Sequence, residues 1–140
     1  MSQRVNLIST IISDDCRKED NGKDIIIGVY TGGIFSAAVP FILPTLAVRF
    51  EIIPTKLSYE RIKFILRDTV ENDIVMATGK LSFNRINFPG AFFFKFGPVK
   101  FEKEGQHSLW LGMDEDPNLV GLLNITKSWT RPAETLIDSA

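Results

Sequence analysis

The sequence predicts an all-β protein: an antiparallel β-sandwich, immunoglobulin-like or jelly-roll-like, of about eight short strands. Along nearly every apolar segment, apolar and polar residues alternate, which is the period of a half-buried strand and not of a helix. Turn-forming Gly, Pro, Asn and Asp recur about every 8–12 residues, and no long amphipathic helix interrupts them. A barrel is the alternative architecture for the same strands.

The first two strands are expected at residues 5–13 and 24–30, which are both rich in β-branched residues. The connection between them contains Asn21-Gly22, a hairpin-turn signal because both residue types tolerate positive φ. Since this connection is longer than a minimal hairpin turn, the sequence predicts a bulge or a projecting loop there.

In three further strands apolar and polar residues alternate strictly, so each strand has a solvent-exposed face and a buried face. Their predicted inward residues are Leu46, Val48, Phe50 and Ile52 in the first, Ile62, Phe64 and Leu66 in the second, and Val75, Ala77, Gly79, Leu81 and Phe83 in the third.

The second half of the chain contains short strand-like runs at residues 91–96, 99–101, 107–113 and 119–126, separated by Gly- and Pro-containing turns. Phe92, Phe94 and Phe96 share one face of an extended run, so we expect them in the core. The sequence predicts one domain over residues 1–127 and a C-terminal tail at 128–140.

The composition is that of one soluble globular domain. Of 140 residues, 44% are hydrophobic, and 17 acidic against 16 basic residues leave a net charge of −1. This balance disfavours a general nucleic-acid binder or a polybasic membrane module, so neither partner is expected. Residues 1–13 lack the unbroken apolar stretch of a signal peptide, and Pro40 and Pro44 interrupt the most apolar segment. We expect a cytoplasmic protein, or one assembled from the cytoplasm into a larger particle.

The sequence contains few residues of the kinds that catalyse reactions. His107 is the single histidine and Cys16 the single cysteine, so one chain provides neither a disulfide nor an ordinary His/Cys zinc site. No nucleophile-elbow, phosphate-loop or dinucleotide-binding motif occurs. The sequence therefore predicts a protein that is not an enzyme and uses no cofactor or metal.

The connection after the first strand interleaves acidic and basic residues. Carboxylates and bases in one loop at the end of a sandwich would suit a small-ligand or metal-binding module, although the spacing does not fit an EF-hand. The alternative interpretation is a turn whose opposite charges pair across the hairpin. The candidate ligand-binding residues are Asp14, Asp15, Arg17, Glu19 and Lys23.

These residues also carry a resemblance. The order Asp14-Asp15-x-Arg17-x-Glu19-x-Asn21-Gly22-Lys23, followed by Gly28-x-Tyr30 and Leu43-Pro44-x-Leu46, resembles a family of small bacterial proteins known only as a domain of unknown function. The family places a cysteine where this chain has Ser13 and an apolar residue where it has Cys16, which argues against thiol chemistry at Cys16. The resemblance implies no activity.

An apolar connection spans residues 34–44, where loops are normally polar. One interpretation is a cap over the open end of the sandwich, and the other is an exposed loop that docks on a partner or a second copy. Trp129 in the tail is a further contact candidate. The candidate interaction residues are Ile34, Phe35, Phe41, Ile42 and Trp129.

We therefore expect a non-catalytic sandwich that acts through protein contacts, as a homo-oligomer or as a component of a larger assembly, including phage or mobile-element assemblies. The alternative is a small-ligand or metal-binding module that uses the charged segment 14–24.

Overall fold

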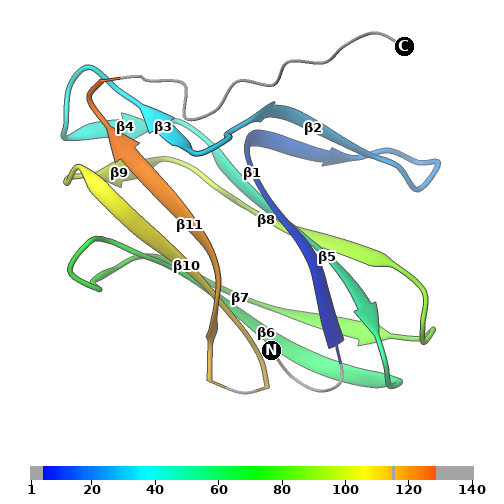
Figure 1. Cartoon of the computed structure of the whole chain (residues 1–140). Coiled ribbons are helices and arrows are strands. Elements are labelled where there is room, and N and C mark those ends of the chain that lie inside the picture. The colour runs from blue at the N-terminus through cyan, green and yellow to red at the C-terminus, as the bar shows by residue number, and fades with distance from the viewer. Residues whose placement is uncertain (1–4, 115, 129–140) are drawn as a thin grey trace, which may run out of the picture.

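The computed structural model of the protein describes residues 5–114 and 116–128 (Figure 1). The regular structure of these residues is entirely β-strand, and it comprises eleven strands. They are β1 (Val5–Lys18), β2 (Asp24–Val29), β3 (Gly33–Phe35), β4 (Phe41–Leu43), β5 (Leu46–Pro54), β6 (Ser58–Arg67), β7 (Asp73–Phe83), β8 (Gly90–Phe96), β9 (Val99–Phe101), β10 (Gly105–Met113) and β11 (Asn118–Thr126).

The strands form two large sheets and one small one. The four-stranded sheet has the order β2-β1-β5-β8, the five-stranded sheet has the order β3-β11-β10-β6-β7, and β4 pairs with β9. Three hairpins, β1–β2, β6–β7 and β10–β11, join neighbouring strands within a sheet, whereas β5–β6 and β7–β8 carry the chain from one large sheet to the other.

The inward faces of both large sheets build one hydrophobic core. Phe50 of β5 and Phe64 of β6 are fully buried, and their rings lie 6.0 Å apart. Phe94 and Phe96 of β8 stack on Phe64 at 5.5 and 5.4 Å, in the offset arrangements that aromatic rings prefer. Because these rings come from three strands of both sheets, they hold the sheets together, and the predicted inward face of 91–96 is confirmed.

The all-β prediction is confirmed, but the strand count and the pairing differ from expectation. The described residues form eleven strands and not about eight, since β3 and β4 occur inside the segment interpreted as an irregular apolar connection. Each has three residues, too few for alternation to be recognised. The five-stranded sheet is also mixed, because β3 pairs with β11 in parallel.

The first strand is longer than predicted and serves two neighbours. Residues 5–13 of β1 pair with β5, and residues 13–18 pair with β2, so the strand changes partner at Ser13. Figure 1 shows that β1 turns sharply in its middle and then runs with β2 above β8. The charged segment 14–24 is therefore not one loop: residues 14–18 continue the strand, Asp24 opens β2, and the connection is limited to residues 19–23.

Candidate functional site

The second half of β1 and the whole of β2 form a hairpin, and we call residues 14–29 the hairpin arm. Two ion pairs attach it to the outer side of the four-stranded sheet. Arg49 Nε of β5 donates to Asp24 at 2.8 Å, with both side chains largely buried, and Lys95 Nζ of β8 donates to Asp15 at 3.0 Å. These two ion pairs hold the arm against β5 and β8.

The tip of the arm is a tight turn at residues 19–23. The backbone N–H of Glu19 donates to the carbonyl of Lys23 at 2.8 Å, and the side-chain oxygen of Asn21 accepts from the N–H of Lys23 at 3.1 Å. Gly22 has a φ of 83°, which glycine adopts at no steric cost. The predicted turn at Asn21-Gly22 is confirmed.

At the base of the arm, three residues form one packing unit. The Tyr30 hydroxyl donates a hydrogen bond to the Asp14 carboxylate, which lies directly over Gly28. Gly28 has a φ of 67°, and a Cβ at this position would overlap the carboxylate. Burial and the neighbouring Asp14 carboxylate raise the pKa of Tyr30. Asp14 therefore contributes to the packing at the base of the arm.

Asp15 is the most connected carboxylate of the arm. It accepts from Arg17 Nε at 2.7 Å, from Lys95 Nζ at 3.0 Å and from the backbone N–H of Cys16 at 2.9 Å. The Arg17 and Lys95 cations hold the pKa of Asp15 at about 2. Its oxygens are occupied by protein donors, which come from β1 itself and from Lys95 of β8, and not from across the hairpin.

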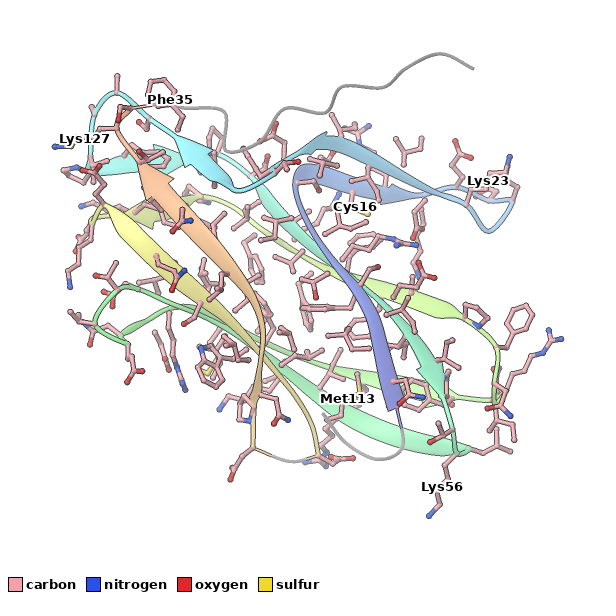
Figure 2. All side chains as sticks on the ribbon, viewed as in Figure 1. Cys16, Lys23, Phe35, Lys56, Met113 and Lys127 are labelled. Carbon is pink, nitrogen blue, oxygen red and sulfur yellow. The ribbon has the colours of Figure 1, made fainter. Side chains whose placement is uncertain are left out.

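Cys16 lies beneath the arm. Its side chain is fully buried, and Figure 2 shows it between the second half of β1 and the strands of the four-stranded sheet. Burial, followed by the nearby Asp24 carboxylate, raises the pKa of the thiol. Because the thiolate is the nucleophile, this environment makes Cys16 unreactive in the folded protein.

A pocket of about 500 Å³ opens between the tip of the arm and the sheet. It is lined by charged side chains of both signs, and Arg49 in its wall is already paired with Asp24 and Glu51. Among the described residues, no group of three or more His, Cys, Asp or Glu side chains is arranged to hold a metal ion. The charged lining residues are Lys18, Glu19, Lys23, Asp24, Arg49 and Glu51.

The candidate contact residues of segment 34–44 divide into two groups. Ile34 is buried in the core, and Phe41 is half-buried with its ring stacked on Phe101 at 5.4 Å. Phe35 and Ile42 are 48% and 61% exposed. The segment thus contributes to the core through one pair of residues and to the surface through the other. Trp129 lies outside the described residues.

Sequence reasoning missed the exposed apolar face of β2. Ile25, Ile27 and Val29 are 42%, 45% and 55% exposed, on the edge strand of the four-stranded sheet. The continuous apolar run in this strand offers no alternation, so the sequence does not distinguish its buried face from its exposed face. The one available signal was the high apolar content of a strand that follows a charged hairpin turn.

The single histidine lies in the five-stranded sheet. His107 of β10 is fully buried beside Phe101, and its Nδ1 lies 3.0 Å from the carbonyl oxygen of Gly105. Its Nε2 has no hydrogen-bond partner among the described residues. His107 lies in the five-stranded sheet and Cys16 in the four-stranded sheet.

Residues 8–126 match a family of unknown function, DUF6941. The chain belongs to the DUF6941 family. Most of the described fold, including the hairpin arm from residue 14 onward, lies within the matched region of this DUF6941 protein. No curated protein matches the chain significantly.

Solved structures resemble this DUF6941 protein at the level of fold. The C-terminal domain of Wzt is similar with a TM-score of 0.53 and 11% identity, over 99% of this chain and 86% of that domain. A β-glucosidase from Listeria innocua, solved with glucose, has a TM-score of 0.42 and 17% identity over 58% of this chain. The chain spans only 14% of that enzyme. A TM-score this low supports no conclusion about the DUF6941 protein.

The described part of the DUF6941 protein contains no helix of the length and apolarity needed to cross a bilayer.

Proposed function

We propose that this DUF6941 protein is a non-catalytic β-sandwich that acts through protein contacts, as a homo-oligomer or as a component of a larger assembly. The observation that carries the proposal is the edge strand β2, where a row of backbone groups without a partner strand among the described residues coincides with three exposed apolar side chains. Such an edge pairs readily with another chain.

The arm makes this edge suitable for a specific contact. Its position is fixed by the Asp24–Arg49 and Asp15–Lys95 ion pairs, so little ordering is required on binding. Ile25, Ile27 and Val29 occupy alternate positions and so share one face of β2, opposite the face of Cys16 and its paired residue Ile26. A strand added to this edge would gain main-chain hydrogen bonds and cover that apolar face.

The exposed members of segment 34–44 extend the proposed contact surface. Phe35 ends β3, the edge strand of the five-stranded sheet, and Ile42 lies in the middle of β4. Their exposure exceeds that expected of core-forming residues, and exposed large apolar side chains favour a binding surface. Ile34 and Phe41 are left out of the proposal, because their contacts are internal.

The remaining expectations belong to the same proposal. We infer an immunoglobulin-like or jelly-roll-like sandwich in the cytoplasm, or in a particle assembled there, including a phage or mobile-element particle. The absence of catalysis is supported by the burial of the single thiol, with its raised pKa, and of the single imidazole on the other sheet. The near-neutral charge favours a protein partner over nucleic acid or membrane.

The experiment is light scattering coupled to size exclusion over a concentration series. We compare the wild type with Ile27→Lys, and we use Val70→Lys as the matched control, because Val70 is an exposed apolar residue in the β6–β7 turn. The proposal expects a mass above that of the monomer, lost in Ile27→Lys and kept in Val70→Lys, with unchanged circular dichroism. A wild type that stays monomeric excludes the homo-oligomer. If the same proteins then co-purify with the wild type and with Ile27→Lys, the component of a larger assembly is excluded as well.

A second candidate function is a small-ligand module, which the pocket of about 500 Å³ beneath the arm favours. Its mixed charges would suit a polar ligand that carries both signs. Thermal-shift measurement against zwitterionic and nucleotide ligands tests it, since a ligand at 100 times its Kd adds about 2.7 kcal/mol to stability. Arg49→Met would abolish the shift of a ligand bound in this pocket, and a shift that survives this substitution places the ligand elsewhere.

A further inference from the structure

The outer face of the five-stranded sheet carries a second surface, independent of β2. Its centre is a transverse row of apolar residues, which the pairing registers place side by side. Met76 of β7 pairs with Ile65 of β6, Ile65 pairs with Trp110 of β10, and Trp110 pairs with Leu119 of β11. We call these four residues the apolar row. Met76 and Leu119 are more than half exposed and Trp110 is half-buried, whereas Ile65 is buried between them, so the row presents Met76, Trp110 and Leu119 to solvent.

The tryptophan in the middle of the apolar row is held in place by its neighbours. Trp110 Nε1 donates to the Ser108 hydroxyl at 2.8 Å, and the Arg67 guanidinium lies 4.9 Å from the centre of the indole ring. Arg67 is itself oriented by Asp73 at 3.0 Å. A fixed, half-buried Trp beside an Arg is the residue combination that dominates binding energy in protein interfaces.

A basic hollow adjoins the apolar row on its Met113 side. Arg61, Lys63 and Lys80 line it, and its volume is about 730 Å³. Gly112, which pairs with Lys63, leaves space because it has no side chain. Within the described part of the chain, none of the three cations has an ion-pair partner, and Asp114 is the one carboxylate that lines the hollow. The hollow therefore carries an excess of two positive charges.

This cluster is unusual in a chain whose net charge is −1. Elsewhere on the described surface, Arg17, Arg49 and Lys103 are paired with carboxylates, and Lys18 and Lys23 share the pocket at the tip of the arm with Glu19, Asp24 and Glu51. Three unpaired cations on adjacent strands repel one another unless an anion lies between them. Charge complementarity thus selects an anionic partner, and the apolar row beside the cations requires that this partner also bring an apolar group.

We propose that this face binds an acidic, extended segment of a partner protein, which places an apolar side chain on the apolar row and its carboxylates on Arg61, Lys63 and Lys80. The spacing follows from β6. Lys63 and Arg61 stand two and four residues from Ile65, about 7 and 13 Å away at the rise of a strand. A segment that lies along β6 would match this with an apolar residue followed by acidic residues two and four positions on.

The probe is a fluorescein-labelled peptide Ser-Leu-Ser-Glu-Ser-Glu-Ser, and the same peptide with Gln for Glu is its control. Anisotropy titrations at low salt compare the wild type with the double variant Lys63→Glu, Lys80→Glu. Lys127→Glu is the matched control, since Lys127 is an exposed lysine at the opposite end of the sheet from Met113 (Figure 2). Met76→Ser tests the apolar row. Circular dichroism verifies folding, and Lys63→Gln with Lys80→Gln replaces any variant that fails to fold.

The proposal expects binding of the acidic peptide by the wild type, weakened by rising salt, at least about tenfold weaker in the double variant, and weaker in Met76→Ser. The control Lys127→Glu should bind within about twofold of the wild type. The proposal is overturned by an acidic peptide that does not bind, by equal losses in the double variant and in Lys127→Glu, or by an oligothymidylate that binds more tightly than the peptide. Self-association that the double variant abolishes would also overturn it, because a second copy would then be the occupant.

Discussion

Replacing Gly28 with alanine tests the packing unit at the base of the hairpin arm. The substitution introduces two separate strains. A φ of 67° is unfavourable for any residue with a Cβ, at about 1–2 kcal/mol. The new methyl group would also lie 3.0 Å from Asp14 Cγ and overlap the carboxylate oxygen, so the Asp14 carboxylate must shift, which disturbs the hydrogen bond that it accepts from Tyr30. Losing a hydrogen bond to a charged acceptor costs about 1.5–3 kcal/mol.

The chain provides a matched control at the tip of the same arm. Gly22 has a φ of 83°, and a Cβ there would meet no atom within 4 Å. Gly22→Ala therefore carries the backbone strain without the collision, and both substitutions change the unfolded chain equally. Their difference isolates the displacement of Asp14. We expect Gly28→Ala to lower the free energy of unfolding by about 2 kcal/mol more than Gly22→Ala does.

Urea unfolding followed by circular dichroism measures both variants. A double-mutant cycle with Asp14→Ala supplies the decisive comparison: without the Asp14 carboxylate, Gly28→Ala should lose its extra cost and match Gly22→Ala. Equal losses for Gly22→Ala and Gly28→Ala in the wild-type background would refute this account of the motif, and so would an extra cost that persists after Asp14 is removed.

Two further predictions concern titration and burial. Because the folded pKa of Asp15 is about 2, below its ordinary 3.8, the ion pairs with Arg17 and Lys95 stabilise the protein above pH ~4 and are lost as the pH falls toward ~2. An NMR titration should show this low pKa, and Lys95→Met should raise it; a midpoint near 4 in the wild type contradicts the ion pairs. His107→Leu should cost about 1 kcal/mol, since it removes the buried Nε2 that has no partner among the described residues but also the Nδ1 contact with the Gly105 carbonyl, whereas His107→Ala should lose about 2–4 kcal/mol to a cavity. Equal losses in urea unfolding would contradict this.

Alternation predicted the large strands well, because burial on one face is recorded directly in the sequence. Phe50 and Phe64 occupy the core as their strand patterns require, and the rings of 91–96 meet them there. The same criterion fails where an element is too short or too apolar. β3 and β4 have three residues each, and the apolar run of β2 hides the fact that Ile25 and Ile27 are exposed.

The charges of the candidate site were visible in the sequence, but their partners were not. Asp15 pairs with a lysine 80 residues away and Asp24 with an arginine 25 residues away. Both pairs exist because β1 changes neighbours at Ser13 and brings the arm across β5 and β8. No local pattern marks that turn, since it depends on long-range pairing and not on a glycine or proline in the strand.

The rate at which the Cys16 thiol reacts can report the motion of the arm. This thiol is the sole one of the chain and is shielded by the arm, so alkylation of the native protein must wait until the arm lifts or the whole fold opens. A labelling rate that exceeds the global unfolding rate would measure the opening of the arm alone. A partner that pairs with the β2 edge would slow this alkylation, so the labelling rate of Cys16 would report whether the exposed face of β2 is occupied.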